Sequence, residues 1–232
     1  MRYFDPSYTQ GIEVGYNNEQ WRLMFGFTDG TNAGNTTFNS GSEWDWALNA
    51  RLEWNVNSSD WARFNDFTSW TSASSYACLV GAAVNYEQSG STNPSTANDP
   101  SQLDYTIDAS CEGAGWNFFA AFLGSHFDPD TGSGEQDDFG LVVQGGIFAS
   151  DQWELFARYD GLYLDKDTAG PGNKKNLHFV TVGTNYYLSR DSHAAKFTGD
   201  VVLAFSKTNG LANAVGSGGL VNDTETGLLG SA

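Results

Sequence analysis

The sequence has little of what a soluble enzyme or a metal protein usually contains. Two cysteines, Cys78 and Cys111, provide neither a multi-disulfide scaffold nor a cysteine-based zinc site. His126, His178 and His193 lie far apart, and none has a second histidine or a cysteine at ligand spacing. The sequence shows no phosphate-binding glycine loop and no Gly-x-Ser-x-Gly elbow. We therefore predict no catalytic residue, no metal site, no cofactor and no enzyme activity.

Basic residues and long apolar runs are also scarce. The 11 Lys and Arg against 28 Asp and Glu give a formal net charge of -17, which argues against a nucleic-acid partner. The mean hydropathy is -0.40, and no run approaches the roughly 18 consecutive apolar residues of a membrane helix. Abundant instead are 16 Phe, 10 Tyr, 8 Trp and 27 Gly. This composition is typical of β-barrel girdles and turns, and also of lectin-like β-sandwiches.

Apolar and polar residues alternate in ten segments, which predicts an all-β fold. The segments are residues 10–16, 21–28, 44–56, 75–87, 102–111, 115–124, 139–149, 153–164, 177–188 and 195–206. The clearest is 44–56, where Trp44, Trp46 and every second residue as far as Val56 are apolar. A tilted strand of this length, at about 3.3 Å per residue, spans a bilayer core.

Strict alternation assigns each residue to one of two faces. In a transmembrane barrel the apolar face meets lipid and the polar face lines the pore. The residues that we predict to be lipid-facing are Trp46, Leu48, Leu52, Trp54, Leu155, Val201 and Leu203. The residues that we predict to line the pore are Arg22, Asp45, Arg51, Glu53, Glu154, Arg158, Asp160, Lys196 and Asp200.

The connections between segments alternate in length, which favours an antiparallel up-and-down transmembrane barrel over a Greek-key sandwich. The short turns are 17–20, 112–114, 150–152 and 189–194, and the long polar loops are 29–43, 88–101, 125–138, 165–176 and 207–232. Residues 57–73 are an exception, a long connection at a short-turn position. Its Trp61, Phe64, Phe67 and Trp70 recur every three residues, as in a turn of amphipathic helix or a folded cap. They lie either at the membrane interface or in a cluster of their own.

Strand parity predicts that these ten strands are part of a larger barrel. If 17–20 is a periplasmic turn, an odd number of strands precedes residue 10. At the other end, residues 207–232 are expected to be an extracellular loop that leads to a missing last strand. Two open edges in lipid would leave backbone groups unpaired at several kcal/mol each, so further strands are expected at both ends.

Five stretches have a familiar order and spacing: TQGIEVGY at 9–16, LVVQGGIFA at 141–149, WELFARYDGL at 153–162, FVTVGTNYYL at 179–188 and AKFTGDVVLAF at 195–205. Together they resemble the phosphate-selective porin (O and P type) family of bacterial outer-membrane porins. The resemblance implies a 16-stranded, usually trimeric, anion-conducting pore in the outer membrane, in contact with outer-membrane lipid. The family's last strand normally ends in an aromatic residue, whereas this chain ends Leu229-Gly230-Ser231-Ala232.

The charges argue against the family's anion selectivity. The predicted lumen set holds four basic residues against the acids Glu13, Asp45, Glu53, Asp104, Glu154, Asp160 and Asp200. An anion needs basic charges in place of its hydration shell. We therefore predict a passive diffusion channel for small hydrophilic solutes or ions, leaning towards cations. Two alternatives stay open: a secreted or surface β-sandwich that binds carbohydrate, and a barrel that serves as an adhesin or receptor.

The cysteines give one further prediction. If 75–87 and 102–111 form a hairpin that is symmetric about its loop, Cys78 faces Cys111 at the short-turn end. An oxidising compartment outside the cytoplasm permits a disulfide there. Two unpaired thiols are the alternative.

Overall fold

The computed structural model describes residues 9–30, 44–58, 60–65, 67–72, 75–89, 99–130, 132, 134–192, 194–205 and, for the backbone, 227–231. These residues form one open antiparallel sheet in which each strand pairs with the next along the chain. The strands are β1 Gly11–Asn17, β2 Trp21–Thr28, β3 Trp44–Asn55, β4 Ala77–Ser89, β5 Ser101–Gly113, β6 Trp116–Asp128, β7 Gln136–Phe148, β8 Trp153–Tyr163, β9 Asn176–Tyr187, β10 Lys196–Ala204 and β11 Gly227–Ser231.

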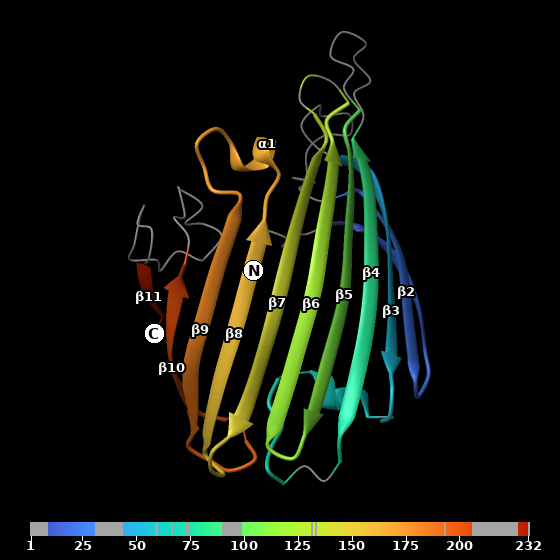
Figure 1. Ribbon diagram of the computed structural model, residues 1–232. Coiled ribbons are helices and arrows are strands. Elements are labelled where there is room, and N and C mark those ends of the chain that lie inside the picture. Colours follow the sequence, from blue (N-terminus) through green and yellow to red (C-terminus); the bar gives the residue numbers. More distant parts are fainter. Residues whose placement is uncertain are drawn as a thin grey trace.

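The ten strands predicted from alternation are all present, and the all-β, up-and-down prediction is confirmed. Helix in the described residues is limited to two single turns, η2 Trp61–Phe64 and α1 Lys166–Ala169. No helix in the described part of the chain is long and apolar enough to cross a membrane. The β1–β2, β5–β6, β7–β8 and β9–β10 turns lie at one end of the sheet together with the longer β3–β4 connection, and the β8–β9 connection lies at the other end (Figure 1). We call these the short-turn end and the long-loop end.

The prediction that 207–232 supplies no returning strand is wrong. Gly227–Ser231 forms β11, which pairs with β10 over five positions from Asp200↔Ser231 to Ala204↔Gly227. Its two leucines are adjacent and flanked by glycines, so the segment has no period-2 alternation that sequence reasoning could detect. Residues 207–226 lie outside the described part of the chain.

A β-bulge in β3 changes one face assignment. Trp44 pairs with Ser89 and Trp46 with Gln88, which leaves Asp45 as the extra residue. A bulge places two residues of one strand opposite one of its partner. The ring of Trp44 contacts Phe127 of β6, whereas Trp46 contacts Tyr86 of β4. Trp44 and Trp46 therefore lie on opposite faces, and Asp45 is an exposed bulge residue rather than a member of the polar row.

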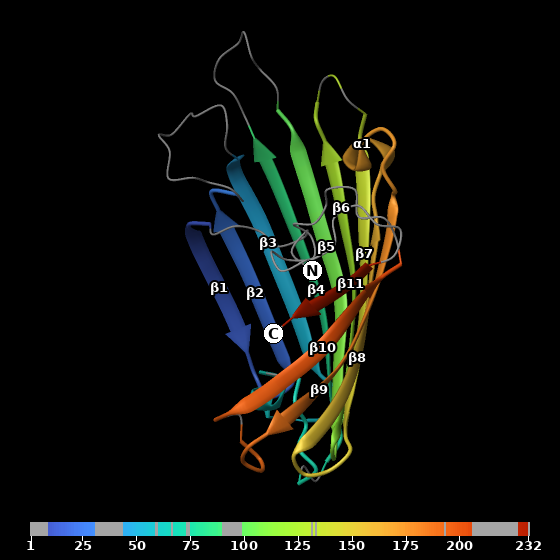
Figure 2. The same cartoon turned by 90° about the vertical axis from the view of Figure 1, so that its left-hand side faces the viewer.

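The sheet is curved, with its polar face on the concave side. Figure 2, turned by 90° from Figure 1, shows the curve from β1 round to β10. Side chains of the polar face reach across a whole strand: Arg51 of β3 meets Asp108 of β5, and Asn117 of β6 meets Glu154 of β8. Ring contacts on the apolar face join neighbouring strands, as Trp21 of β2 does with Trp54 of β3. Contacts between second-neighbour strands on the polar face alone agree with that face being the concave one.

Burial on the two faces is the reverse of that in a soluble protein. Glu53, Glu112 and Glu154 on the polar face are 8%, 5% and 3% exposed, whereas Ile12 and Ile107 on the apolar face are 74% and 61% exposed. One apolar cluster does lie on the concave side, at the long-loop end. It is formed by Leu162, Leu164, Ala169, Leu177, Phe179, Ala204 and Val202. It anchors the β8–β9 connection, which contains α1, onto the sheet.

Candidate functional site: the polar face

A ladder of ion pairs crosses the polar face from β2 to β5. Arg22 Nη1 donates to Glu53 Oε2 at 3.3 Å, and Arg51 Nε donates to Glu53 Oε1 at 2.9 Å. Arg51 then holds Asp108 with both terminal nitrogens, at 2.8 and 3.0 Å. Two-pronged guanidinium–carboxylate pairs are the strongest and most oriented of the charge-assisted hydrogen bonds. Two basic and two acidic side chains therefore balance one another along this row.

Gly81, which has no side chain, lies between the partners of this ladder. Asp108 pairs in register with Gly81 of β4, and Gly81 pairs with Glu53 of β3. A Cβ on Gly81 would lie 2.5 Å from Arg51 Nη2 and 2.8 Å from Asp108 Oδ1. Glycine in the intervening strand therefore leaves open the space in which this ion pair forms, and a larger residue there would require the ends of the Arg51 and Asp108 side chains to shift.

The same arrangement recurs around Glu154, on the other side of the polar face. Its carboxylate accepts hydrogen bonds from Asn117 Nδ2 at 3.0 Å, Asn185 Nδ2 at 2.8 Å and Tyr187 Oη at 2.8 Å. The intervening residue is Gly146, whose Cβ would lie 2.7 Å from Glu154 Oε1. All three donors are neutral groups, in contrast to the guanidinium groups that hold Glu53 and Asp108.

The remaining predicted polar residues lie on the same face, near β8 and β10. Arg158 Nη2 donates to Asp160 Oδ1 at 2.7 Å within β8. Lys196 lies with its ammonium 5.9 Å from the ring centre of Tyr187. Asp200 follows two strand periods after Lys196 and pairs in register with Gly183. Of the predicted pore-lining residues, only Asp45 does not belong to this face, because it is the extra residue of the β-bulge in β3.

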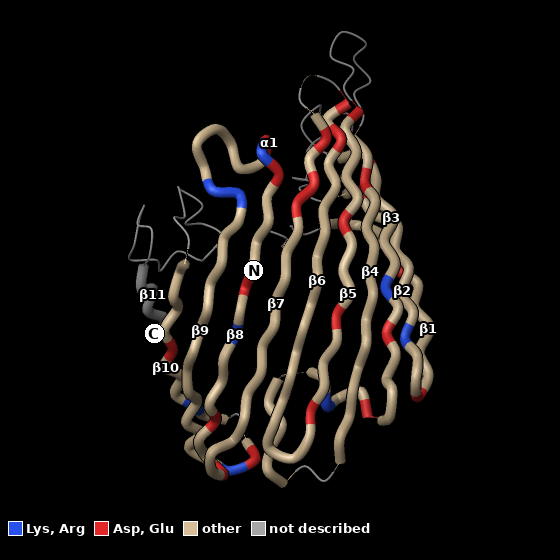
Figure 3. Tube along the Cα trace, in the orientation of Figure 1, with Lys and Arg blue, Asp and Glu red and all other residues tan. Residues whose placement is uncertain are grey.

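Acidic residues outnumber basic ones on the polar face. Figure 3 shows acidic positions recurring along the strands, with fewer basic ones between them. In the described part of the chain, the acids of this face are Glu13, Glu53, Glu87, Asp104, Asp108, Glu112, Asp138, Glu154, Asp160 and Asp200, and the basic residues are Arg22, Arg51, Arg63, Arg158 and Lys196. Asp108, Glu87, Glu112, Asp138 and Arg63 were missing from the predicted set. The alternation Asp104, Thr106, Asp108 would have revealed the first of them.

The residues predicted to face lipid lie on the opposite, convex face. Leu48, Leu52, Trp54, Leu155, Val201 and Leu203 are all large apolar side chains exposed there. Trp46 lies beside Tyr86, whose ring is 5.6 Å away on the same face. The apolar face is continuous from β1 to β10, so it forms a single large exposed surface.

Residues 60–65 and 67–72 of the long β3–β4 connection cross the concave side of the sheet at the short-turn end. Phe67 and Trp70 pack on the sheet instead of in a cluster of their own, and a position at the membrane interface stays a prediction. Phe67 packs on Phe119 of β6 at 5.0 Å, and Trp70 packs on Phe148 of β7 and Tyr187 of β9 at 5.4 and 4.8 Å between ring centres. We call residues 60–65 and 67–72 the strap.

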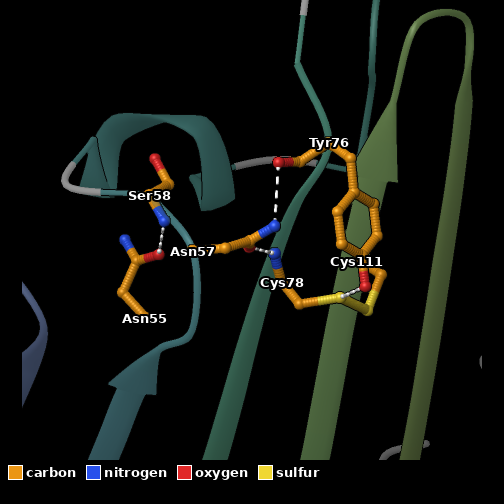
Figure 4. Close-up of a disulfide and its surroundings, with 6 residues drawn as sticks. All are labelled: Asn55, Asn57, Ser58, Tyr76, Cys78 and Cys111. Carbon is orange, nitrogen blue, oxygen red and sulfur yellow. Dashed lines mark hydrogen bonds between the residues drawn. A yellow bond between two sulfur atoms is a disulfide. The ribbon is translucent and has the colours of Figure 1, made fainter.

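Cys78 and Cys111 form a disulfide, as the hairpin register predicts (Figure 4). Their Cα atoms are 4.1 Å apart. Tyr76 covers the bridge, with its hydroxyl 2.8 Å from Cys78 Sγ and its ring stacked on Trp116. Beside it, Asn57 accepts a hydrogen bond from Cys78 N at 2.9 Å and donates one to Tyr76 O at 3.1 Å. The disulfide thus lies where the connection that contains the strap joins β4.

Two of the three histidines lie in pairs on the apolar face. His126 Nδ1 is 2.9 Å from Asp137 Oδ1, and His178 Nδ1 is 2.7 Å from the hydroxyl of Tyr159. His193 lies outside the described residues. Within the described ranges, no group of three or more His, Cys, Asp or Glu is placed to hold a metal ion.

The fold and the polar face define a class: one curved antiparallel sheet with polar residues buried on its concave side and apolar residues exposed on its convex side. Searches with this chain match no protein-family model, no curated protein and no solved structure. The likeness to the phosphate-selective porins therefore stays a prediction.

Proposed function

We propose that this chain forms part of the wall of a pore in a bacterial outer membrane, through which small hydrophilic solutes and ions diffuse passively. The observation that supports this best is the inverted burial of the two faces. Burying a Leu, Ile or Phe side chain in an apolar environment is worth about 1.5–3 kcal/mol. The convex face leaves many such side chains exposed, from Ile12 on β1 to Leu203 on β10. Lipid around a barrel would supply the apolar environment that water does not.

The alternative of a carbohydrate-binding sandwich is less well supported. A sandwich packs the apolar faces of two sheets together and turns the polar faces to water. Here the polar face curves inward and holds buried ion pairs such as Arg51–Asp108, and the described residues supply no second sheet against the apolar face. A solvated lumen is a suitable environment for such charges, whereas the interior of a sandwich is not.

Closure of the barrel needs strands beyond those described. The described part of β1 pairs with β2 alone, and that of β11 with β10 alone. Within lipid, free edges would leave peptide groups unpaired at a cost of several kcal/mol each. We propose that further strands join these edges. The family resemblance supports a 16-stranded barrel that assembles as a trimer.

The charges of the polar face support a preference for cations over anions such as phosphate. Arg22, Arg51, Arg63 and Arg158 each form an ion pair with a carboxylate of the same face. Glu154 has neutral partners only, and so does Asp104, which accepts from Gln102 Nε2 at 3.0 Å. With ten acidic residues against five basic ones, Lys196 included, the described part of the face has an excess of negative charge, which attracts cations and repels anions.

The test is single-channel recording of the full-length protein in a planar bilayer, with reversal potentials measured across a salt gradient. We expect stepwise conductance and a reversal potential of the sign set by cations. Absence of conductance would refute the pore. Conductance with an anion preference would leave the pore standing and refute the charge argument.

A further inference from the structure

The strap joins widely separated parts of the sheet across its concave side. At one end, Trp61 Nε1 donates to the carbonyl of Asn18 in the β1–β2 turn, at 3.0 Å. At the other end, Ser72 Oγ donates to Asp191 in the β9–β10 turn, at 2.7 Å. These turns belong to opposite ends of the strand order. The strap therefore runs across the curve of the sheet instead of following its rim.

The strap is held by polar contacts in its middle as well as at its ends. Arg63 Nε donates to Glu112 at 2.6 Å, and Arg63 also donates to Ser75 Oγ and O at 2.9 and 2.7 Å. Ser69, which is buried, donates to the carbonyl of Gly113. Gly115 N donates to the carbonyl of Trp70 at 3.1 Å. Both ionised partners of the Arg63–Glu112 pair are largely shielded from solvent, which makes the pair costly to open.

Aromatic contacts add to these hydrogen bonds on the lumen side. Trp70 contacts Phe148 and Tyr187, which are themselves stacked at 5.6 Å. Thr68 lies 3.2 Å from the hydroxyl of Tyr187, the same hydroxyl that donates to Glu154. Arg22 lies 4.3 Å from the ring centre of Trp61, so the first charge of the ion-pair ladder also contacts the strap. The strap is thus packed against the polar face itself.

We infer that the strap narrows the mouth of the pore at the short-turn end and sets the size limit for solutes there. The inference rests on the proposed pore function and deepens it. Pore diameter at the narrowest point decides which solutes pass and how large the conductance is. Because the strap occupies lumen space and is fixed at both ends and in the middle, it acts as a permanent restriction.

The main experiment replaces residues 58–75 with a short Gly/Ser turn of about four residues, a length that antiparallel strands accept. The strands are already adjacent at this point, because Val56 N donates to Cys78 O at 2.9 Å. Asn57 and Tyr76 are kept, so the hydrogen bonds at the disulfide remain. Single-channel conductance and the largest neutral polyethylene glycol that enters from each side of the bilayer are measured on the full-length protein.

We expect conductance to rise about twofold or more, and larger polymers to enter from the short-turn side while the limit on the other side stays the same. Trp70→Ala, a milder variant, should change both quantities in the same direction. Phe118→Ala is the control, because it removes an aromatic ring from the convex face beside Phe119 and should change neither. An intact Cys78–Cys111 disulfide checks the folding of each variant.

The outcomes separate this inference from the proposed function. A wild-type protein that does not conduct refutes the pore. A conducting wild type whose strap replacement and Trp70→Ala variant leave both conductance and polymer limit unchanged, or lower them, refutes the restriction and leaves the pore intact.

Discussion

Arg51 on β3 and Asp108 on β5 form a two-pronged ion pair that passes over β4 at Gly81. The pair joins strands that are not hydrogen-bonded to each other. It therefore links second-neighbour strands in addition to neutralising two charges. Asn117 and Glu154 do the same over Gly146, between β6 and β8. Both of these contacts thus pass over a glycine in the strand between their partners.

Gly81→Ala tests whether the Arg51–Asp108 ion pair depends on glycine at this position of β4. The added methyl group would overlap Arg51 Nη2 and Asp108, so the ion pair must open or the strands must move apart. Overpacking of this kind typically costs about 1–3 kcal/mol. We expect a loss of that size in the free energy of unfolding, measured by guanidinium titration in phospholipid vesicles. Gly199→Ala in β10 is the matched control, because a Cβ there meets nothing within 4 Å. Equal losses in both variants would contradict the role assigned to Gly81.

Two neighbouring residues in the middle of β5 test which face meets lipid. Ile107 lies on the convex face and is 61% exposed, whereas Thr106 lies on the polar face between Asp104 and Asp108. An arginine at the bilayer midplane costs about 2–4 kcal/mol on the lipid face of a barrel. Ile107→Arg should destabilise the protein, lowering its free energy of unfolding in vesicles by that amount. Thr106→Arg should cost much less, because two carboxylates flank it. The reverse order would mean that the polar face, not the apolar one, meets lipid.

The disulfide should contribute to stability by restricting the unfolded chain. Cys78 and Cys111 are separated by 33 positions in the sequence. Loop-closure entropy for a loop of this size predicts about 3–4 kcal/mol. The Cys78→Ser, Cys111→Ser double variant should lose this amount in the same vesicle titration while its circular dichroism still shows the β-sheet, since the hairpin register is fixed along the whole of β4 and β5. A loss well below 1 kcal/mol would show that the unfolded chain is already restricted without the bridge.

How far the sequence predicted the structure differs from one element to the next. Period-2 alternation located the strands because each has one apolar and one polar face, and hairpin symmetry located the Cys78–Cys111 pair. The bulge at Asp45 could not be predicted, because the alternation of Trp44 and Trp46 continues through it unchanged. The strand β11 has no alternation. The aromatics of the strap showed only a spacing, and their partners Phe119, Phe148 and Tyr187 depend on how the sheet curves.

The polar face was predicted in composition but not in pairing. Arg51, Glu53, Glu154 and Arg158 were assigned to one face by alternation alone, and they lie there. Which acid neutralises which base depends on the register between strands and on the glycines between them. Alternation can place Asp108 on the polar face, but Asp108 can be identified as the partner of Arg51 only once β5 is known to lie two strands from β3. For the same reason the sequence did not reveal that Glu154 has neutral partners.

Selectivity should shift in opposite directions when an unpaired acid and a paired base are removed. Two unit charges about 10 Å apart in water interact by about 0.4 kcal/mol before screening, and a Debye length of about 10 Å at 0.1 M salt reduces this value. Because a lumen charge attracts one ion and repels the other, Asp104→Asn should lower the cation-to-anion permeability ratio by about 1.5–2-fold. Arg51→Gln should raise the ratio by a similar factor, because it leaves the negative charges of Asp108 and Glu53 less neutralised.

Asp137→Asn, at an exposed acid on the convex face paired with His126, is the control and should leave the ratio unchanged. Reversal potentials in a potassium chloride gradient measure all three. If Asp104→Asn and Arg51→Gln moved the ratio in the same direction, these residues would not face the permeating ions, and the polar face would not be the lining of the pore.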